Sequence, residues 1–324
     1  MLPDFTYVRP SSVKEALSHL TEEKTRVMAG GTDLLGCLRD EVFEAHHVVA
    51  ISHIDALRGV REAEDGGLKI GALSTISEVA EHPVIKRRFY ALAKAASEVA
   101  SPQLRNQGTL GGNLCQKPRC WYYRGAFHCL RKGGDICYAV GGENQYHCIL
   151  GGDHCYIVHP SDIAAALTAL EAAVHIAGPA GTRIVPVEEF HIPPGENPQK
   201  ETVLRNDEIV THVVLPGTRK GLRSNYRKVR ARRAWDFALA GVALAVQFAS
   251  QTVAKARVVL SGAAPVPWRC REAEEVLVGK AINAEIAKEA AGAAVAKAEP
   301  LSRNGYKVTL FRNVVEEELL GISH

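Results

Sequence analysis

The sequence lacks several features that would assign it to a common class of protein. No apolar run approaches the roughly 20 residues that a membrane-spanning helix needs. No basic run is long enough to indicate nucleic-acid binding, and the net charge of the 324 residues is only +3. The first residues, Met1–Phe5, contain no basic segment followed by an apolar core, so no signal peptide is visible. We therefore expect a cytoplasmic protein with no membrane span and no nucleic-acid partner.

The sequence also contains no Cys-x-x-Cys pair, although it has eight cysteines, six of them between Cys115 and Cys155. In the cytoplasm, clustered cysteines are more often metal ligands than disulfides. Structural zinc sites usually take their ligands from two close pairs, whereas most gaps in this segment are wide and irregular. The spacing favours an iron–sulfur cubane held by one long loop. A zinc site and a cysteine-rich loop without metal are the alternatives.

Four cysteines are enough to hold a cubane. Cys115 lies very close to a glycine turn, and Cys148 belongs to an apolar run that we expect to pack in the interior. The four remaining cysteines of the segment are predicted to be the metal ligands: Cys120, Cys129, Cys137 and Cys155. The histidines of the same segment are alternative ligands: His128, His147 and His154.

Two glycine turns could hold the phosphates of a nucleotide. The first, at residues 30–34, follows a short apolar strand at residues 26–29. The second, at residues 109–113, lies directly before the clustered cysteines. Glycine lets the backbone approach an anion closely, and free N–H groups at a helix start face the anion. Neither turn has the GxGxxG order of a Rossmann site, so we expect a nucleotide to use the two turns together.

Strands and helices alternate through the first two-thirds of the chain, which predicts an α+β fold. The composition changes near residue 217, where we place a domain boundary. We predict a first domain at 1–216, with subdomains at about 1–55 and 56–216 and the cysteine insert at about 115–158. Residues 217–324 form a second α+β domain. Its expected elements are a three-stranded sheet from residues 224–229, 240–248 and 256–260, and helices at residues 271–278, 284–297 and near 308–320.

Three short segments of the sequence together resemble the FAD-binding (medium) subunit of the molybdenum hydroxylases. This family includes xanthine dehydrogenase, aldehyde oxidoreductases and carbon monoxide dehydrogenase. The three segments are Ala29–Leu34, Thr109–Asn113 and Pro160–Ala164. Tyr226–Arg230 and Trp235–Ala238 match the lysine and aspartate of the family's C-terminal domain. The resemblance implies a two-subdomain, PCMH-like FAD-binding domain.

The cysteine insert resembles a narrower branch of that family. This branch includes the β subunit of 4-hydroxybenzoyl-CoA reductase and the FAD subunit of periplasmic aldehyde oxidoreductase, in which an additional loop holds a [4Fe-4S] cluster. The four predicted ligands match those of the branch in order. The resemblance therefore implies two cofactors, FAD and a [4Fe-4S] cluster.

The resemblance also implies which residues hold the flavin. Eight residues would form the first pyrophosphate turn: Val27, Met28, Ala29, Gly30, Gly31, Thr32, Asp33 and Leu34. Four would form the second: Thr109, Gly111, Gly112 and Asn113. Asp162 would bond the ribityl or ribose region, and Ile209 would pack on the flavin or adenine. Lys228 would lie near the isoalloxazine, where a positive charge stabilises reduced flavin.

The implied function is electron transfer within an oxidoreductase complex. The chain would act in a heterotrimer with a molybdopterin-binding large subunit and a [2Fe-2S] small subunit, and would exchange electrons with an external carrier, ferredoxin or NAD. No catalytic residue is predicted in this chain, because no general base and nucleophile stand at a persuasive spacing. Two alternatives are a stand-alone FAD oxidoreductase with its own substrate and a zinc-stabilised binding protein.

Overall fold

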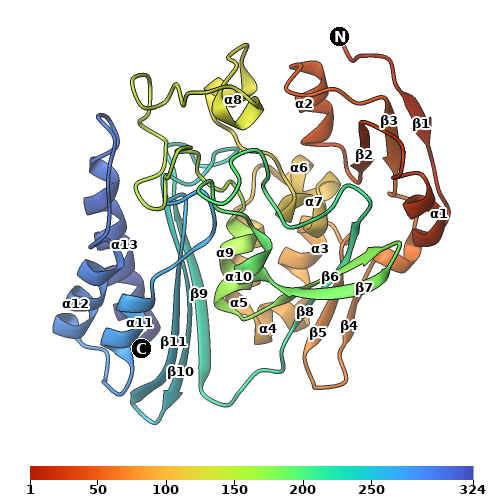
Figure 1. The fold of residues 1–324 in the computed structure, drawn as a ribbon. Helices are drawn as coiled ribbons and strands as arrows, with labels where there is room; N and C mark the ends of the chain where they lie inside the picture. Colours follow the sequence, from red (N-terminus) through yellow and green to blue (C-terminus); the bar gives the residue numbers. More distant parts are fainter. Residues whose placement is uncertain (324) are drawn as a thin grey trace.

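A computed structural model describes residues 1–323 and contains three β-sheets with helices packed between and around them (Figure 1). The N-terminal lobe is built on a parallel sheet of order β1-β3-β2. Its elements are β1 (Thr6–Val8), α1 (Val13–Ser18), β2 (Thr25–Met28), α2 (Leu34–Arg39) and β3 (His47–Ala50). The strand and helix expected around the first glycine turn are therefore present, and the turn joins β2 directly to α2.

The second subdomain contains a five-stranded sheet of order β4-β5-β8-β6-β7, in which all neighbours are antiparallel. Its strands are β4 (Val60–Glu62), β5 (Leu68–Gly71), β6 (Ala173–Gly178), β7 (Gly181–Pro186) and β8 (Ile209–Leu215), preceded by a 3-10 turn, η1 (Asp55–Leu57). The helices of this subdomain are α3 (Ile76–Glu81), α4 (Pro83–Arg88), α5 (Tyr90–Ser97), α6 (Pro102–Gln107), α7 (Leu110–Leu114), α9 (Asp162–Ala169) and α10 (Val187–Phe190).

Helix α9 lies at the centre of the molecule, and all eight of its residues are buried (Figure 1). Four of the eight are alanines, whose small side chains let α5, α10 and three strands of the C-terminal sheet approach the helix closely. Ser161 caps the helix by accepting a hydrogen bond from the Ala164 amide at 2.9 Å. The cap fixes the backbone at Asp162, the first residue of the helix.

The C-terminal domain has a four-stranded antiparallel sheet of order β12-β11-β10-β9. Its strands are β9 (Leu222–Val229), β10 (Ala240–Ala249), β11 (Thr252–Ser261) and β12 (Trp268–Arg269), and its helices are α11 (Arg271–Leu277), α12 (Ala284–Ala294) and α13 (Tyr306–Ser323). The predicted three-stranded sheet was wrong by one strand. The fourth strand has only two residues, which is too short for an alternating pattern to appear in the sequence.

Strand β10 separates two cores because its side chains alternate between the faces of the sheet. Val242 and Leu244 pack with the three C-terminal helices, whereas Ala243 and Ala245 join the core of the first domain. The smaller residues face α9, so the two domains share a close interface.

The cysteine segment, residues 115–160, has little regular structure and lies over the junction of the domains (Figure 1). It contains only α8 (Trp121–Arg124) and a 3-10 turn, η2 (Leu130–Lys132). Its far end is attached to the C-terminal domain, because the amide of Ile149 donates to the carbonyl of Ala263 at 2.8 Å. The buried ammonium of Lys307 also donates to the carbonyls of His147 and Gly262, at 3.1 and 2.6 Å.

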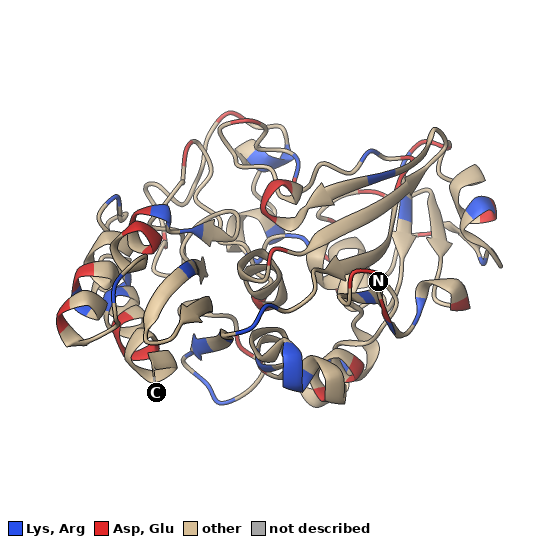
Figure 2. Cartoon of the chain, turned by 90° about the horizontal axis from the view of Figure 1, so that it is seen from below, with Lys and Arg blue, Asp and Glu red and all other residues tan. Residues whose placement is uncertain are grey.

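Positive and negative residues are interspersed over the helices and loops in a second view of the chain (Figure 2). This distribution agrees with the small net charge of +3. Within residues 1–323, no helix combines the length and apolar character needed to cross a bilayer.

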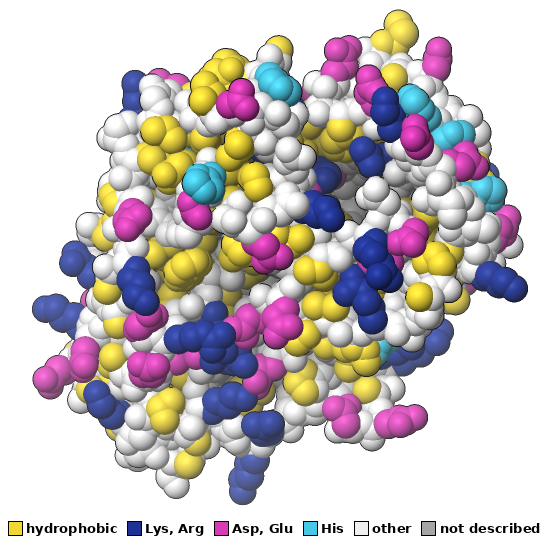
Figure 3. All heavy atoms as spheres, in the orientation of Figure 1, with side chains coloured by type: hydrophobic (Ala, Val, Ile, Leu, Met, Phe, Trp, Pro, Cys, Tyr) yellow, Lys and Arg dark blue, Asp and Glu magenta, His cyan; other side chains and the backbone are white. Residues whose placement is uncertain are grey.

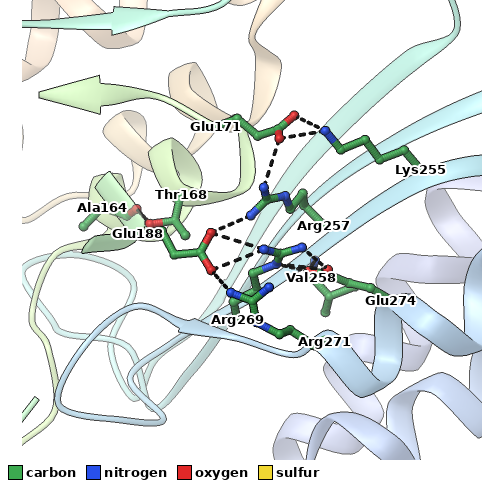
Figure 4. A network of polar contacts seen from close by, with 10 residues as sticks. All are labelled: Ala164, Thr168, Glu171, Glu188, Lys255, Arg257, Val258, Arg269, Arg271 and Glu274. Atoms are coloured by element: carbon green, nitrogen blue, oxygen red, sulfur yellow. Dashed lines mark hydrogen bonds and ion pairs between the residues drawn. The ribbon is translucent and has the colours of Figure 1, made fainter. Parts of the chain in front are cut away.

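A network of ion pairs joins the two domains (Figure 4). Glu188, in α10, pairs with Arg257 at 2.7 Å, with Arg269 at 3.2 Å and with Arg271. Arg257 and Arg269 are both less than one-fifth exposed. Burial raises the pKa of Glu188, but the hydrogen bonds and charges of these two arginines outweigh it and hold the pKa below its usual value.

We predict that the Glu188→Gln substitution weakens this domain contact. It replaces the charged partner that three guanidinium groups share with a neutral one, which costs about 1–3 kcal/mol, while Arg257 keeps Glu171 and Arg269 keeps Glu274. The free energy of unfolding in urea should fall by that amount at neutral pH. Since the pKa of Glu188 is lowered in the folded chain, the difference should disappear as acid protonates the carboxylate.

The neighbouring substitution Glu189→Gln is the matched control, because Glu189 is exposed in the same helix. It should leave the free energy of unfolding within about 0.5 kcal/mol of the unchanged chain. Equal effects of the two substitutions would contradict a special role for the network.

Candidate functional site

The two glycine turns line one cavity of about 360 Å³ between the N-terminal lobe and the rest of the chain. Most of the predicted flavin residues surround this cavity: Val27, Met28, Ala29, Gly30, Gly31, Thr32, Asp33, Leu34, Thr109, Gly112, Asn113, Asp162 and Lys228. The turns lie about 80 residues apart in the sequence. They meet because the N-terminal lobe packs against α6 and the start of α7.

Gly30 has no room for a side chain. A Cβ atom there would lie 2.0 Å from the carbonyl oxygen of Gln107, immediately before the second turn. Gly31 has a φ of +72°, in the left-handed region that favours glycine. The glycines therefore let two backbone segments approach each other beside the cavity, which is the cradle that a pyrophosphate requires.

Two predicted contacts do not line the cavity. Gly111 is buried against Ala72, and a Cβ atom at Gly111 would lie 2.9 Å from the Ala72 Cβ. Ile209 is 3% exposed and packs in the core with Leu57 and Leu73. Neither residue lines the cavity: Gly111 allows α7 to pack closely on Ala72, directly after β5, and Ile209 begins β8 in a core shared with the N-terminal lobe.

Asp33 has a role that the sequence did not reveal. Asp33 stands at the N-terminal end of α2, but its side chain makes no hydrogen bond that caps this helix. Its carboxylate instead accepts hydrogen bonds of 2.7 Å from the side chains of Arg119 and Arg124 and from the amide of Lys117. The first glycine turn is thus fixed to the start of the cysteine segment.

The inner end of the cavity is closed by a buried polar group. Asp162 accepts hydrogen bonds from the hydroxyl of Tyr226 at 2.6 Å and from the ammonium of Lys228 at 2.7 Å. The Lys228 side chain is 1% exposed and also donates to the carbonyl of Glu98. Burial, followed by the charge of Asp162, raises the pKa of Tyr226 well above its usual value, so Tyr226 stays protonated as a donor.

Tyr226 was not predicted as a site residue. It lies two positions before Lys228 in β9, and residues two apart face the same side of a strand. This two-residue spacing is the feature of the sequence that indicates that Tyr226 lies on the same side of β9 as Lys228. The pair brings a C-terminal-domain lysine against the carboxylate at the start of α9.

The four predicted cysteine ligands, Cys120, Cys129, Cys137 and Cys155, all line a second, small cavity. Cys148 does not line it, although it is fully buried nearby. The cysteines form no disulfides among residues 1–323. Burial raises the pKa of Cys120 to about 11 and raises that of Cys137, so these thiols are protonated at neutral pH unless a metal displaces the proton.

Arg131 is the one charged side chain on the wall of the cysteine cavity, and its side chain is 2% exposed. It pairs with Glu201 at 3.0 Å, and its Nε atom has no hydrogen-bond partner. Burial lowers the pKa of Arg131, but the charges of Cys155 and Glu201 outweigh it and raise the pKa. Within residues 1–323, no three His, Cys, Asp or Glu side chains converge as the ligands of a single metal ion do.

A third cavity, of about 210 Å³, lies between the other two. Arg119 and Asp162 line both this cavity and the glycine-lined cavity. Cys120 and His147 line both this cavity and the cysteine cavity. The adjacent residues Arg119 and Cys120 therefore connect the two candidate cofactor sites along the backbone.

Comparison with known proteins identifies the class of protein that this fold and site define. The profile described as "FAD binding domain in molybdopterin dehydrogenase" matches residues 3–218, and "CO dehydrogenase flavoprotein C-terminal domain" matches residues 224–320. The aldehyde oxidoreductase FAD-binding subunit PaoB of Escherichia coli K12 is 34% identical over 320 residues, which cover 97% of each chain.

The carbon monoxide dehydrogenase medium chain of Hydrogenophaga pseudoflava is 29% identical over 300 residues, which cover 92% of this chain and 88% of that one. The solved structure of carbon monoxide dehydrogenase from the same organism superposes with a TM-score of 0.78 and 28% identity, and the match covers 100% of this chain and 98% of the other. The chain belongs to the family of FAD-binding medium subunits of the molybdenum hydroxylases. It is an oxidoreductase subunit, and the family and α+β fold expected from the sequence are confirmed.

We predict that Gly30→Ala prevents normal flavin binding. The added methyl group would collide with the Gln107 carbonyl and push the two turns apart. The ratio of flavin absorbance to protein in the purified chain should fall at least tenfold, which corresponds to about 1.4 kcal/mol of binding free energy.

Gly36→Ala in α2 is the matched control, since a Cβ atom there meets nothing within 4 Å. It should keep the flavin and raise stability by about 0.5–1 kcal/mol, as expected for alanine within a helix. A full flavin content in the Gly30 variant would contradict the assignment of this cavity.

Proposed function

We propose that this chain carries FAD and a [4Fe-4S] cluster and transfers electrons within a molybdenum hydroxylase-type complex. The observation that carries the proposal is the meeting of four irregularly spaced cysteines at one cavity, beside a second cavity lined by two glycine turns. The chain would belong to the [4Fe-4S]-containing branch of its family. Residues 1–216 would hold both cofactors and residues 217–324 would complete the flavin site.

The residues of the larger cavity suit FAD. The turns at residues 27–34 and 109–113 would hold the pyrophosphate, because their glycines expose backbone N–H groups. Asp162 and Lys228 would contact the ribityl chain and the isoalloxazine, and the buried Lys228 ammonium favours added negative charge nearby. The bound flavin would supply one- and two-electron redox chemistry, while these residues bind and orient it.

The residues of the cysteine cavity suit a [4Fe-4S] cluster. Cys120, Cys129, Cys137 and Cys155 would be the ligands, and Arg131 would offset the negative charge of the thiolates. The cluster would supply one-electron transfer between the flavin and an external carrier.

The surface supports a role as a subunit. Hydrophobic side chains gather on the cysteine segment, and the same face is hollowed between this segment and the N-terminal lobe (Figure 3). Several large apolar residues of the segment are half exposed: Trp121, Phe127, Ile136, Val140 and Tyr146. Such apolar surface is typical of interaction sites. The proposed partners are a molybdopterin-binding large subunit, a [2Fe-2S] small subunit and, as carrier, ferredoxin or NAD, in a cytoplasmic heterotrimer.

The decisive experiment is purification of the full chain without oxygen. We expect the absorption spectrum of a flavin, about four irons and about four acid-labile sulfides per chain, as a single cubane requires. Zinc without sulfide would support the zinc-stabilised alternative. A colourless chain without iron would overturn the proposal. Turnover of a substrate by the isolated chain would favour the stand-alone oxidoreductase.

We predict that Cys129→Ser removes the cluster and leaves the flavin. Cys129 lines the cysteine cavity but not the glycine-lined cavity, so only the iron and sulfide contents should fall to background. Cys148→Ser is the matched control, because Cys148 is buried in the same segment but lines neither cavity. The ligand assignment is wrong if Cys148→Ser loses iron while Cys129→Ser keeps it.

A further inference from the structure

His147 lies against one proposed cluster ligand. Its Nε2 atom is 3.3 Å from the sulfur of Cys120, and the residue is 5% exposed. The other ring nitrogen, Nδ1, is buried and has no hydrogen-bond partner within the described chain. A thiolate can only accept a hydrogen bond, so a proton on Nε2 would be shared with the sulfur whenever Cys120 binds metal.

The position of this ring is fixed from the C-terminal domain. The backbone carbonyl of His147 accepts hydrogen bonds from the side chains of Asn304 and Lys307, both at 3.1 Å. The His147 amide donates to the carbonyl of Asn144 at 3.0 Å, and the Asn144 side chain accepts from the amide of Arg303 at 2.9 Å. The backbone that carries the imidazole is therefore held by the start of α13, independently of the cysteines.

Cys120 is the proposed ligand on the side of the cysteine cavity that adjoins the third cavity. It alone of the four ligands lines the cavity between the two cofactor sites, and His147 lines the same cavity. Its neighbour in the chain, Arg119, reaches the glycine-lined cavity. A hydrogen bond to this sulfur would thus act on the side of the cluster that faces the flavin.

We propose that His147 is a positioning residue that donates a hydrogen bond to the Cys120 thiolate and thereby raises the reduction potential of the cluster. The inference rests on the proposed [4Fe-4S] cluster. Reduction places additional negative charge on the sulfurs, and a donor at a ligand sulfur stabilises the reduced form more than the oxidised form. His147 is not a ligand in this proposal, and it changes the affinity of the cluster for an electron.

The test compares His147→Leu with His147→Gln in the full chain purified without oxygen. Leucine removes the donor, whereas the glutamine amide retains an N–H. The readouts are the iron content and the midpoint potential of the cluster, from a redox titration followed by electron paramagnetic resonance. We expect full iron in the glutamine variant, a more negative potential in the leucine variant, and a glutamine potential closer to that of the unchanged chain.

His128→Leu is the matched control. His128 precedes the ligand Cys129 but is exposed, and its ring makes no hydrogen bond within the described chain. The midpoint potential of the cluster in this variant should equal that in the unchanged chain. A shift as large as that of His147→Leu would overturn the inference, because the loss of any histidine near the cluster would then produce the same shift.

The remaining outcomes separate this inference from the proposed function. If the chain without any substitution contains no iron, the proposed cluster is wrong. A loaded chain whose potential is unaffected by His147→Leu refutes only the hydrogen bond. If the leucine variant loses its iron, the glutamine variant decides between the roles of His147. Full iron and a nearly unchanged midpoint potential in the glutamine variant support the donor role. Loss of iron in the glutamine variant overturns the donor role and favours a ligand or a purely structural role.

Discussion

The carboxylate of Asp33 is the contact on which the arrangement of both candidate sites depends. It lies at the end of the first glycine turn and binds two arginines and one amide from the start of the cysteine segment. Only 18% of its side chain is exposed, so these hydrogen bonds face little competition from water. One side chain therefore fixes the wall of the glycine-lined cavity relative to Cys120, the nearest cysteine of the other cavity.

A second buried contact joins the parts of the chain that close the glycine-lined cavity. Asp162 begins the alanine-rich helix α9, and Lys228 and Tyr226 come from the C-terminal sheet. Removing a partner from a buried charge pair leaves an uncompensated charge, so such a pair specifies how two domains meet even where it adds little net stability. The small residues on both sides of this interface let the pair form within direct hydrogen-bonding distance.

The sequence predicted the features that depend on local chemistry. The glycine turns, the α+β fold and the four cysteines of the second cavity follow from residue type, spacing and resemblance. What it missed depends on tertiary contacts. The burial of Ile209 and Gly111 away from the glycine-lined cavity, and the pairing of Asp33 with arginines 86 and 91 positions away, could not be read from residue type or spacing. The two-residue strand β12 is visible only through its pairing with β11.

The attachment of the cysteine segment to α13 has a consequence for local opening of the chain. Asn304 and Lys307 hold the backbone of His147 on the wall of the cysteine cavity, although they lie more than 150 residues further along the chain. Displacement of the start of α13 would therefore also release the backbone around His147. Hydrogen exchange at these two distant segments should be coupled for this reason.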